Sequence, residues 1–362
     1  MNREEKLWFW AVNTKGIGMK RFTALIDSGI DLEECFADPS ILKNIGFGES
    51  VIASLKKAAD MDRIEAAISQ IEEKGITVLV CISRKYPVLL REIAAPPPIL
   101  YVKGDLSLLE GRNIAVVGTR KASENGFRNI RSIACDLAGS GVTVVSGMAI
   151  GIDSAAHLGA LDAKGKTVAV LGSGIDIVYP PENRRLYDRI CETGTVVSEY
   201  PPGTPPSRGT FPARNRIISG ISYGVLFGEG LLGSGGHITV NCAVEENRDV
   251  FAMPGDISNP NSQLPNILIE EGANVALGAA SILAYYHWGD AAETRKSDDR
   301  IDRLDVMQKK IYLAVREAGA VSVDELTERL HISSREAALS LTKLELSGFV
   351  ERITGGRFEA KK

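Results

Sequence analysis

The clearest chemical signal in this sequence is a stretch that collects arginines and excludes acids. Between Tyr200 and Gly228 the chain carries Arg208, Arg214 and Arg216 and no Asp or Glu. The whole chain is acidic, with 42 Lys and Arg against 46 Asp and Glu, so composition does not explain the gap. Mixed charges normally cost less than a cluster of one sign. The stretch therefore predicts a surface that receives an anionic ligand.

Glycine and hydroxyl residues follow several predicted strands at the point where each strand ends. The apolar runs IAVVG, VTVVSGMA, TVAVLGSG and YGVLFGEG each lead into such a turn. Glycine lets the backbone approach a phosphate, and the start of a following helix adds N–H donors and a partial positive charge. One such turn is weak evidence, because glycine often serves packing alone. Several turns along one sheet edge, beside the arginine-rich stretch, predict contacts to consecutive phosphates.

The motifs of several enzyme classes are missing. The first turn reads GTRKASENG instead of GxGxxG, and Ser146 stands where an NAD-binding domain has an acidic residue. No GxxxxGK[ST] sequence occurs, which argues against an ATPase. GISYG matches the hydrolase G-x-S-x-G pattern, but a predicted helix precedes it and a strand follows it. A nucleophile elbow needs the reverse order, so we interpret this match as chance.

Three residues are candidate bases. Glu199 and Glu229 end predicted strands and could act as general bases, but we expect them to bond loop backbone or to orient an arginine. His157, in GIDSAAHLGAL, is expected to be a core or first-turn histidine. The histidines show no metal-ligand spacing, so the sequence predicts no metal site and no cofactor.

The elements that must position these residues belong to a doubly wound α/β domain, an extended Rossmann-like fold, over residues 76–288. Its apolar runs are nearly continuous in Val, Ile, Leu and Ala, which is typical of a parallel sheet covered on both faces. Intervening stretches such as ENGFRNIRSIACDLAG have helical spacing. In such folds ligands bind at the carboxyl ends of the strands.

Two smaller segments flank this domain. Residues 1–75 are predicted to be helical, and Gly16/Gly18 and Gly46/Gly48 each form a turn before an amphipathic helix. This pattern resembles a tandem helix-hairpin-helix or SAM-like domain that binds DNA backbones, and a plain helical bundle is the alternative. Residues 289–303 are predicted to be a linker. Residues 304–362 predict a winged helix, with FVERITGGRFEA as its hairpin; its charge is balanced, so a regulatory module is as good an interpretation as a DNA reader.

Composition bounds the class of protein. A chain of 362 residues with 44% hydrophobic and 24% charged residues predicts a globular protein of two or three domains. The cysteines form no CxxC pair, and we interpret them as reduced core thiols in a cytoplasmic protein. No run of about 18 apolar residues occurs, so the sequence predicts neither a membrane span nor an export signal.

Four segments of the central domain resemble a known protein family. The segments VVGTRKASENG (116–126), VVSGMAIGIDSAAHLGAL (144–161), SEYPPGTPPSRGTFPARNRIISGIS (198–222) and NRDVFAMPG (247–255) are similar to the DNA-processing protein A family, also called DprA or Smf. The resemblance covers most of the central domain. It departs from the family pattern at EGLLGSGGHITV (229–240) and at Leu264-Pro265, which leaves the contribution of those loops open.

The resemblance implies a sequence-independent single-stranded DNA binder, not an enzyme, which protects incoming DNA and loads a RecA-type recombinase in natural transformation. It also implies a homodimer. Arg120 would grip the DNA backbone. Residues of the turns and of the arginine-rich stretch would line the same groove: Gly118, Thr119, Lys121, Ser146, Gly147, Lys166, Phe211, Arg214, Asn215 and Arg216. A cationic track beside an aromatic ring is how single strands are held, and Phe211 lies between Arg208 and Arg214. The alternative is a phosphoribohydrolase on a related Rossmann fold, whose PGGxGTxxE segment is not matched by FGEGLLGSGGHITV.

Overall fold

The structure, a computed structural model, describes residues 1–362 except 234, 289–303, 331, 348, 354–355 and 361–362. Residues Met1–Trp288 pack as one unit and Gly289–Lys362 belong to a second. The boundary expected at residue 75 falls inside the first unit. The linker expected at 289–303 lies outside the described residues.

A mixed sheet forms the centre of the first unit, in the order β1-β2-β6-β5-β4-β3-β7-β8-β9. From β6 to β9 all neighbours in this order are parallel. These parallel strands are β3 (Asn113–Val117), β4 (Thr143–Ser146), β5 (Thr167–Leu171), β6 (Thr195–Ser198), β7 (Gly224–Phe227), β8 (Asp249–Ala252) and β9 (Asn274–Val275). The apolar runs that predicted strands, which also include TVVSEY and DVFAMPG, form β3 to β8, so this part of the fold prediction is confirmed.

The edge next to β6 is antiparallel, which the sequence did not predict. Strand β2 (Ile99–Gly104) pairs with β6, and β1 (Thr77–Val80) pairs with β2, both antiparallel. Antiparallel edge strands are common on otherwise parallel sheets. The predicted parallel sheet thus carries two antiparallel strands at one edge.

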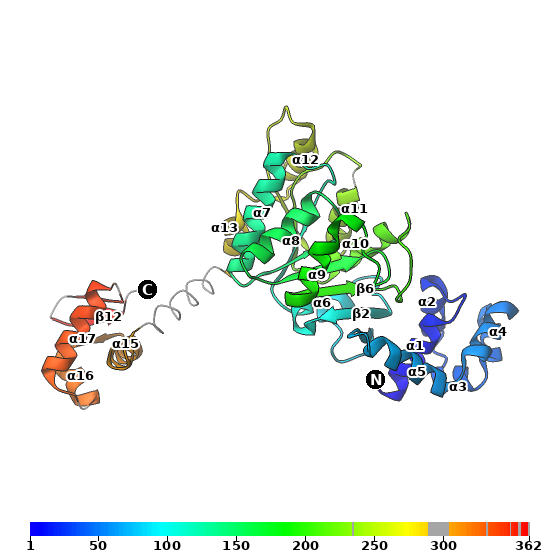
Figure 1. The fold of residues 1–362 in the computed structure, drawn as a ribbon, viewed down its shortest axis with the longest axis horizontal. Coiled ribbons are helices and arrows are strands. Elements are labelled where there is room, and N and C mark those ends of the chain that lie inside the picture. Colours follow the sequence, from blue (N-terminus) through cyan, green and yellow to red (C-terminus); the bar gives the residue numbers. More distant parts are fainter. Residues whose placement is uncertain (234, 289–303, 331, 348, 354–355, 361–362) are drawn as a thin grey trace. The chain divides into compact units, whose positions relative to one another are not determined.

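Helices cover both faces of the sheet, which confirms the doubly wound architecture (Figure 1). One face packs against α7 (Glu124–Gly139), α8 (Ile152–Asp162), α9 (Arg184–Thr193) and α13 (Ala279–Tyr285). The other packs against α6 (Val88–Arg91), α10 (Thr210–Gly220), α11 (Gly235–Glu245) and α12 (Gln263–Glu270). Val116 and Val117 follow each other in β3, are both buried, and belong to the cores on opposite faces. This explains why the strands are apolar on both faces.

The strand order reverses at β3. After β3 the chain continues through β4, β5 and β6 on one side, whereas β7 and β8 lie on the other side. At such a switch point the loops that follow neighbouring strands lead away in opposite directions and leave a crevice at the carboxyl ends. This crevice is where the candidate site lies.

The N-terminal segment is helical, as predicted. Its elements are α1 (Arg3–Asn13), α2 (Met19–Asp27), α3 (Leu32–Ala37), the 3₁₀ helix η1 (Pro39–Ile45), α4 (Glu49–Ala58) and α5 (Met61–Glu72). Gly16 and Gly46 have positive φ, and Gly18 and Gly48 are the N-caps of α2 and α4. The two predicted turns are therefore present. The segment is tied to the sheet because the Trp8 indole donates to the Pro98 carbonyl over 2.8 Å.

The second unit is a winged helix, as predicted. It consists of α15 (Val306–Ala318), β10 (Ala320–Val321), α16 (Val323–Leu330), α17 (Ser334–Leu346), β11 (Val350–Arg352) and β12 (Phe358–Ala360). The strands form a small sheet in the order β10-β12-β11. Ile311, Leu326 and Leu341 contribute one fully buried side chain from each helix to its core.

Candidate nucleic-acid interface

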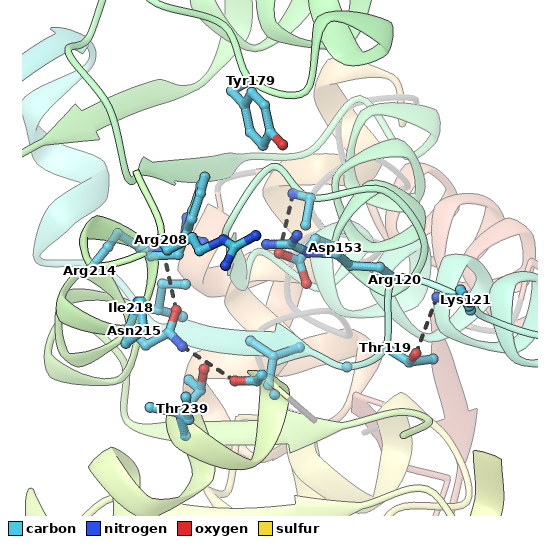
Figure 2. Close-up of a pocket in the computed structure, with 18 residues that line it drawn as sticks. Thr119, Arg120, Lys121, Asp153, Tyr179, Arg208, Arg214, Asn215, Ile218 and Thr239 are labelled. Carbon is cyan, nitrogen blue, oxygen red and sulfur yellow. Dashed lines mark hydrogen bonds between the residues drawn. The ribbon is translucent and has the colours of Figure 1, made fainter. Parts of the chain in front are cut away.

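A cavity of about 640 Å³ lies at the crevice where the strand order reverses. Figure 2 shows Arg120 and Asp153 in the middle of it, with Tyr179 to one side and Thr239 on the opposite side. Its walls come from the loops after β3, β4 and β5, the stretch that enters α10, and the start of α11. The residues that line it are Val117, Gly118, Thr119, Arg120, Lys121, Ala149, Asp153, Tyr179, Arg208, Phe211, Pro212, Arg214, Asn215, Ile218, Gly235, Gly236, Ile238 and Thr239.

Exposed cations on loops form the entrance of the cavity. Arg120 and Lys121 follow β3, and Arg208 precedes α10; all three are exposed. Within the described part of the chain, none of them has an acidic partner in a salt bridge. Their charges are therefore available to an anionic ligand.

Two aromatic rings stand beside these cations. The rings of Tyr179 and Phe211 have centroids 5.4 Å apart. The guanidinium of Arg120 lies over the Phe211 ring, 5.4 Å from its centroid. Phe211 also fills the space beside Gly172, where a Cβ would come within 2.9 Å of the ring. Phe211 is thus partly covered, and Tyr179, 41% exposed, offers the more open ring surface.

Arg214 lines the cavity but differs from the loop cations. It is 4% exposed, and its guanidinium donates to the carbonyls of Gly147, over 2.7 Å, and Val170. Burial lowers the pKa of Arg214 to about 10, and the nearby Asp153 carboxylate opposes this shift. Arg214 therefore holds the ends of β4 and β5 together. Arg214 thus lines the cavity, as expected, but its Nη1 donates to carbonyls of the protein itself.

Arg216 is not among the residues that line the cavity. Its guanidinium pairs with Glu199, and both side chains are largely buried. An arginine of the acid-free stretch is thus paired with Glu199, which directly follows β6. Glu199 therefore contacts an arginine, as predicted, whereas Arg216 does not line the cavity and its contact with DNA stays a prediction.

Glu229 bonds loop backbone, which is the other role that we expected for these two carboxylates. It is 4% exposed and accepts hydrogen bonds from the Ser123 amide, 2.8 Å, and the Ser123 hydroxyl, 2.6 Å. Ser123 caps α7, so a carboxylate of the protein already occupies this helix N-terminus. This turn therefore does not offer its helix start to a phosphate.

The glycines of the turns also serve packing. A Cβ on Gly118 would meet Ile152 and the Glu229 carbonyl at 2.7 Å, and one on Gly147 would meet the Arg214 guanidinium at 2.5 Å. We expected a phosphate to lie close to the backbone at these glycines. In the structure, other groups of the protein occupy that space. Gly118 and Thr119 still line the cavity, and Gly147 lines a smaller hollow of about 80 Å³ beside it.

The remaining predicted residues divide between the cavity and other places. Asn215 lines the cavity, and its amide donates to the Gly235 carbonyl over 3.4 Å. Ser146 is fully buried and donates to the Val116 carbonyl. Lys166 precedes β5 and donates to the Thr193 carbonyl over 3.0 Å, so it lies at the amino ends of the strands. The expectation that Ser146 and Lys166 line the groove is therefore corrected.

His157 is a core histidine, as predicted. It is fully buried, and its Nδ1 lies 2.7 Å from the Thr167 hydroxyl, which itself donates to the Val144 carbonyl. The hydroxyl proton is thus used, and Nδ1–H must be the donor to Thr167. Burial lowers the pKa of His157 to about 3, so the ring is neutral. GISYG likewise lies between α10 and β7, the order that excludes a nucleophile elbow.

An aromatic and an acidic residue are among the cavity-lining residues that the sequence did not reveal. Tyr179 lies in the long loop after β5, and its position beyond a strand end was the only available signal. Asp153 lies in the first turn of α8 and lines the cavity although it is 7% exposed. The described residues contain no group of His, Cys, Asp and Glu that could hold a metal ion. Among the same residues, no helix has the length and apolar character that a membrane span requires.

Comparison with known proteins agrees with this architecture. Residues 77–287 match the family model for DNA recombination-mediator protein A, and residues 297–356 match that for the DprA winged helix domain. The Synechocystis sp. protein Smf is 33% identical over 99% of this chain and 100% of its own length. DNA processing protein DprA of Streptococcus pneumoniae is 44% identical over 56% of this chain and 72% of its own.

Two solved structures share the fold. That of DNA processing protein A from S. pneumoniae has a TM-score of 0.60 and 34% identity, covering 74% of this chain and 98% of that one. That of the Helicobacter pylori protein, which concerns its single-stranded DNA binding mode, has a TM-score of 0.53 and 27% identity, covering 58% and 95%. This chain therefore belongs to the DNA recombination-mediator protein A family, whose members are called DprA or Smf.

Proposed function

We propose that this protein binds single-stranded DNA without a fixed sequence, through the cavity at the carboxyl ends of the strands. The observation that carries the proposal is the combination of exposed, unpaired loop cations with two aromatic rings at one opening. Arg120 and Arg208 supply charge, and Tyr179 supplies an exposed ring. Cations neutralise phosphates and rings stack on bases, so the pair of features suits an unpaired strand. The H. pylori relative, whose single-stranded DNA binding mode has been described, supports it.

The test is a fluorescence titration of a labelled oligothymidine at several salt concentrations, with a duplex of the same length as the comparison. We expect tighter binding of the single strand and an affinity that falls as salt rises, because phosphate contacts release counterions. Equal affinity for both forms, or an affinity that salt does not change, would contradict the proposal.

We further propose that the bound strand is protected and handed to a RecA-type recombinase, as membership in a recombination-mediator family suggests. The measurement is the rate at which a RecA-type protein forms filaments on an oligonucleotide coated with single-strand-binding protein. The chain should raise this rate. Filament formation at an unchanged rate would leave DNA binding in place and remove the mediator role.

A homodimer is part of the proposal. Val275 in β9 and Leu277 just after it are 44% and 81% exposed, and they stand at the edge of the sheet. Exposed apolar side chains at a sheet edge favour association with a second chain. Leu277→Arg should shift the sedimentation coefficient toward the monomer, whereas Val244→Arg, on exposed α11 surface, should not. A monomeric wild type would contradict this part.

We propose no catalytic step for the cavity. Glu199 and Glu229, the carboxylates that stood as candidate bases, are held by Arg216 and Ser123. A phosphoribohydrolase would release free base from nucleoside monophosphates. Chromatography of such an incubation should show no released base, and release above the level of a heat-inactivated sample would overturn the non-enzymatic proposal.

A further inference from the structure

A carboxylate lies inside a cavity that otherwise collects cations. Asp153 is 7% exposed and lines the cavity together with Arg120 and Arg208. Its Oδ2 accepts a hydrogen bond from the Ala149 amide over 3.3 Å. A binding site for a polyanion gains nothing from a negative charge on its floor, because like charges repel most strongly where water is excluded. The presence of Asp153 therefore needs a reason of its own.

One reason is that Asp153 balances the buried charge of Arg214. Burial raises the pKa of Asp153, and Arg214, a hydrogen bond from the Ala149 amide, Arg120 and a hydrogen bond from the Gly147 amide oppose this rise. Arg214, however, directs its Nη1 to the carbonyls of Gly147 and Val170. None of the salt bridges among the described residues joins Asp153 to Arg214. Asp153 can therefore balance the charge of Arg214 without accepting a hydrogen bond from it. A carboxylate has about four lone-pair sites, so the oxygens of Asp153 can accept further hydrogen bonds.

The chemistry of DNA limits what this carboxylate can accept. The sugar–phosphate backbone of DNA carries phosphates, ether oxygens and no 2′-hydroxyl, so within the chain it offers no hydrogen-bond donor. Donors occur on the bases alone. The cavity, at about 640 Å³, lies within the range of about 300–1,000 Å³ that small-ligand pockets have. A base can therefore enter toward Asp153 while its phosphates remain near Arg120, Lys121 and Arg208.

The rings give such a base a surface to rest on. Tyr179 is 41% exposed, and its ring lies 5.4 Å from that of Phe211 at the same opening. Stacking on an aromatic ring does not distinguish one base from another. Discrimination must come from the edge of the base that meets the carboxylate.

Guanine is the base whose edge fits a carboxylate. Its N1–H and N2–H₂ donors are adjacent and parallel, and match the two oxygens of one carboxylate. Adenine and cytosine place an acceptor next to their amino group, and thymine places its N3–H between two carbonyl oxygens. We propose that Asp153 forms a guanine-selective subsite within the cavity. This inference rests on the proposed single-stranded DNA binding and adds a preference at one nucleotide position.

The first experiment uses the full chain without substitution. Labelled short oligothymidines carrying one central dG, one central deoxyinosine or no replacement are titrated under the same salt conditions. Inosine retains N1–H and lacks the N2 amino group. The dG oligonucleotide should bind at least about fivefold more tightly than oligothymidine, the gain of a bidentate base contact, with inosine between them. Equal affinity for all three overturns the inference, while salt-dependent binding of oligothymidine keeps the proposed function. Absence of binding to any of them overturns both.

The second experiment uses Asp153→Asn, which keeps the size of the side chain and an oxygen for the Ala149 amide. The variant should lose the difference between the dG and all-thymidine oligonucleotides. Asp162→Asn removes a carboxylate from the other end of α8, where it pairs with Arg131 over 2.6 Å, and should retain the difference. Equal weakening of all three oligonucleotides by Asp153→Asn would mean that Asp153 serves Arg214 alone, and overturns the inference. If Asp153→Asn fails to fold, the titrations of the unsubstituted chain decide.

Discussion

The cations of helix α10 and those of the neighbouring loops look alike in the sequence and do different work in the structure. Arg214 and Arg216 on α10 are buried or largely buried, and donate to backbone carbonyls and to Glu199. Arg120 and Arg208 on the loops are exposed. The helix packs against the sheet, so its polar side chains must find partners inside the protein. The loops face the cavity and are free of that requirement.

This difference teaches how such a site is built. The helix arginines fix the ends of β4, β5 and β6 in place, and the loop cations then present charge from a fixed frame. We therefore expect substitutions on α10 to change stability and substitutions on the loops to change binding.

The largest effect is expected for Arg214→Ala. The substitution removes donors to the Gly147 and Val170 carbonyls and leaves Asp153 buried without the charge that favours its ionised form. Loss of one partner of a buried charged group costs about 3–5 kcal/mol. Urea unfolding should show this loss in the free energy of unfolding. Arg208→Ala, from an exposed loop position in the same segment, should stay within about 0.5 kcal/mol of wild type. Equal stability of the two variants would contradict the division.

The contrast also shows what the sequence could and could not reveal about the site. Arg120, Phe211 and Asn215 follow from strand ends and from the arginine-rich stretch, which are local signals. The backbone partners of Arg214 do not, because Gly147 is 67 residues away. The sequence predicted that Glu199 could orient an arginine but not that this arginine is Arg216, 17 residues further along the chain. The sequence shows that no acid lies near these arginines along the chain. Folding, however, places acids from other segments beside them. Asp153 was missed for the same reason.

The fold was more accessible than the site. Strands β3 to β8 could be predicted because each is apolar on both faces, a property of the strand itself. The antiparallel pairing of β1 and β2 was not predictable in this way, since it depends on packing: Tyr101 belongs to the core formed with the distant N-terminal helices, and Val102 to the core on the opposite face. Lys166 was misplaced because a residue before a strand and one after it lie at opposite edges of a parallel sheet. The direction of β5 settles its position.

The second prediction concerns His157, which is buried and neutral, in contrast to Arg214, which is buried and charged. His157 has a pKa of about 3 in the fold and about 6.5 when unfolded. Below about pH 6.5 the unfolded chain takes up a proton that the folded chain refuses, so stability falls as pH is lowered toward 3. From pH 7 to pH 5 this group should account for a loss of about 2 kcal/mol.

Urea unfolding at both pH values measures the effect. His157→Gln should remove this part of the pH dependence, whatever it does to absolute stability. His287→Gln, at an exposed position, should retain it. A wild-type pH dependence that survives in His157→Gln would show that another group is responsible.

The third prediction sharpens the role of the rings. Tyr179→Ala should weaken oligothymidine binding by about 1–3 kcal/mol, the range for one stacked base, and leave the salt dependence unchanged because a ring releases no counterion. Tyr223 is a matched control, since it is 42% exposed against 41% for Tyr179 and lies at the amino end of β7. Tyr223→Ala should bind as wild type does. A similar loss in both variants would place the strand elsewhere on the protein.

The smallest effect on stability, and the most diagnostic one for binding, is expected for the loop cations. Arg120→Ala and Arg208→Ala should each change the free energy of unfolding by less than about 0.5 kcal/mol. Each should reduce the slope of log affinity against log salt by about 0.7, the value for one phosphate contact on a single strand. Lys166→Ala removes an equal charge from the opposite edge of the sheet and should leave the slope as it is. A reduced slope for Lys166→Ala with an unchanged one for Arg120→Ala would move the DNA path to the amino ends of the strands, because salt dependence counts only the charges that the phosphates meet.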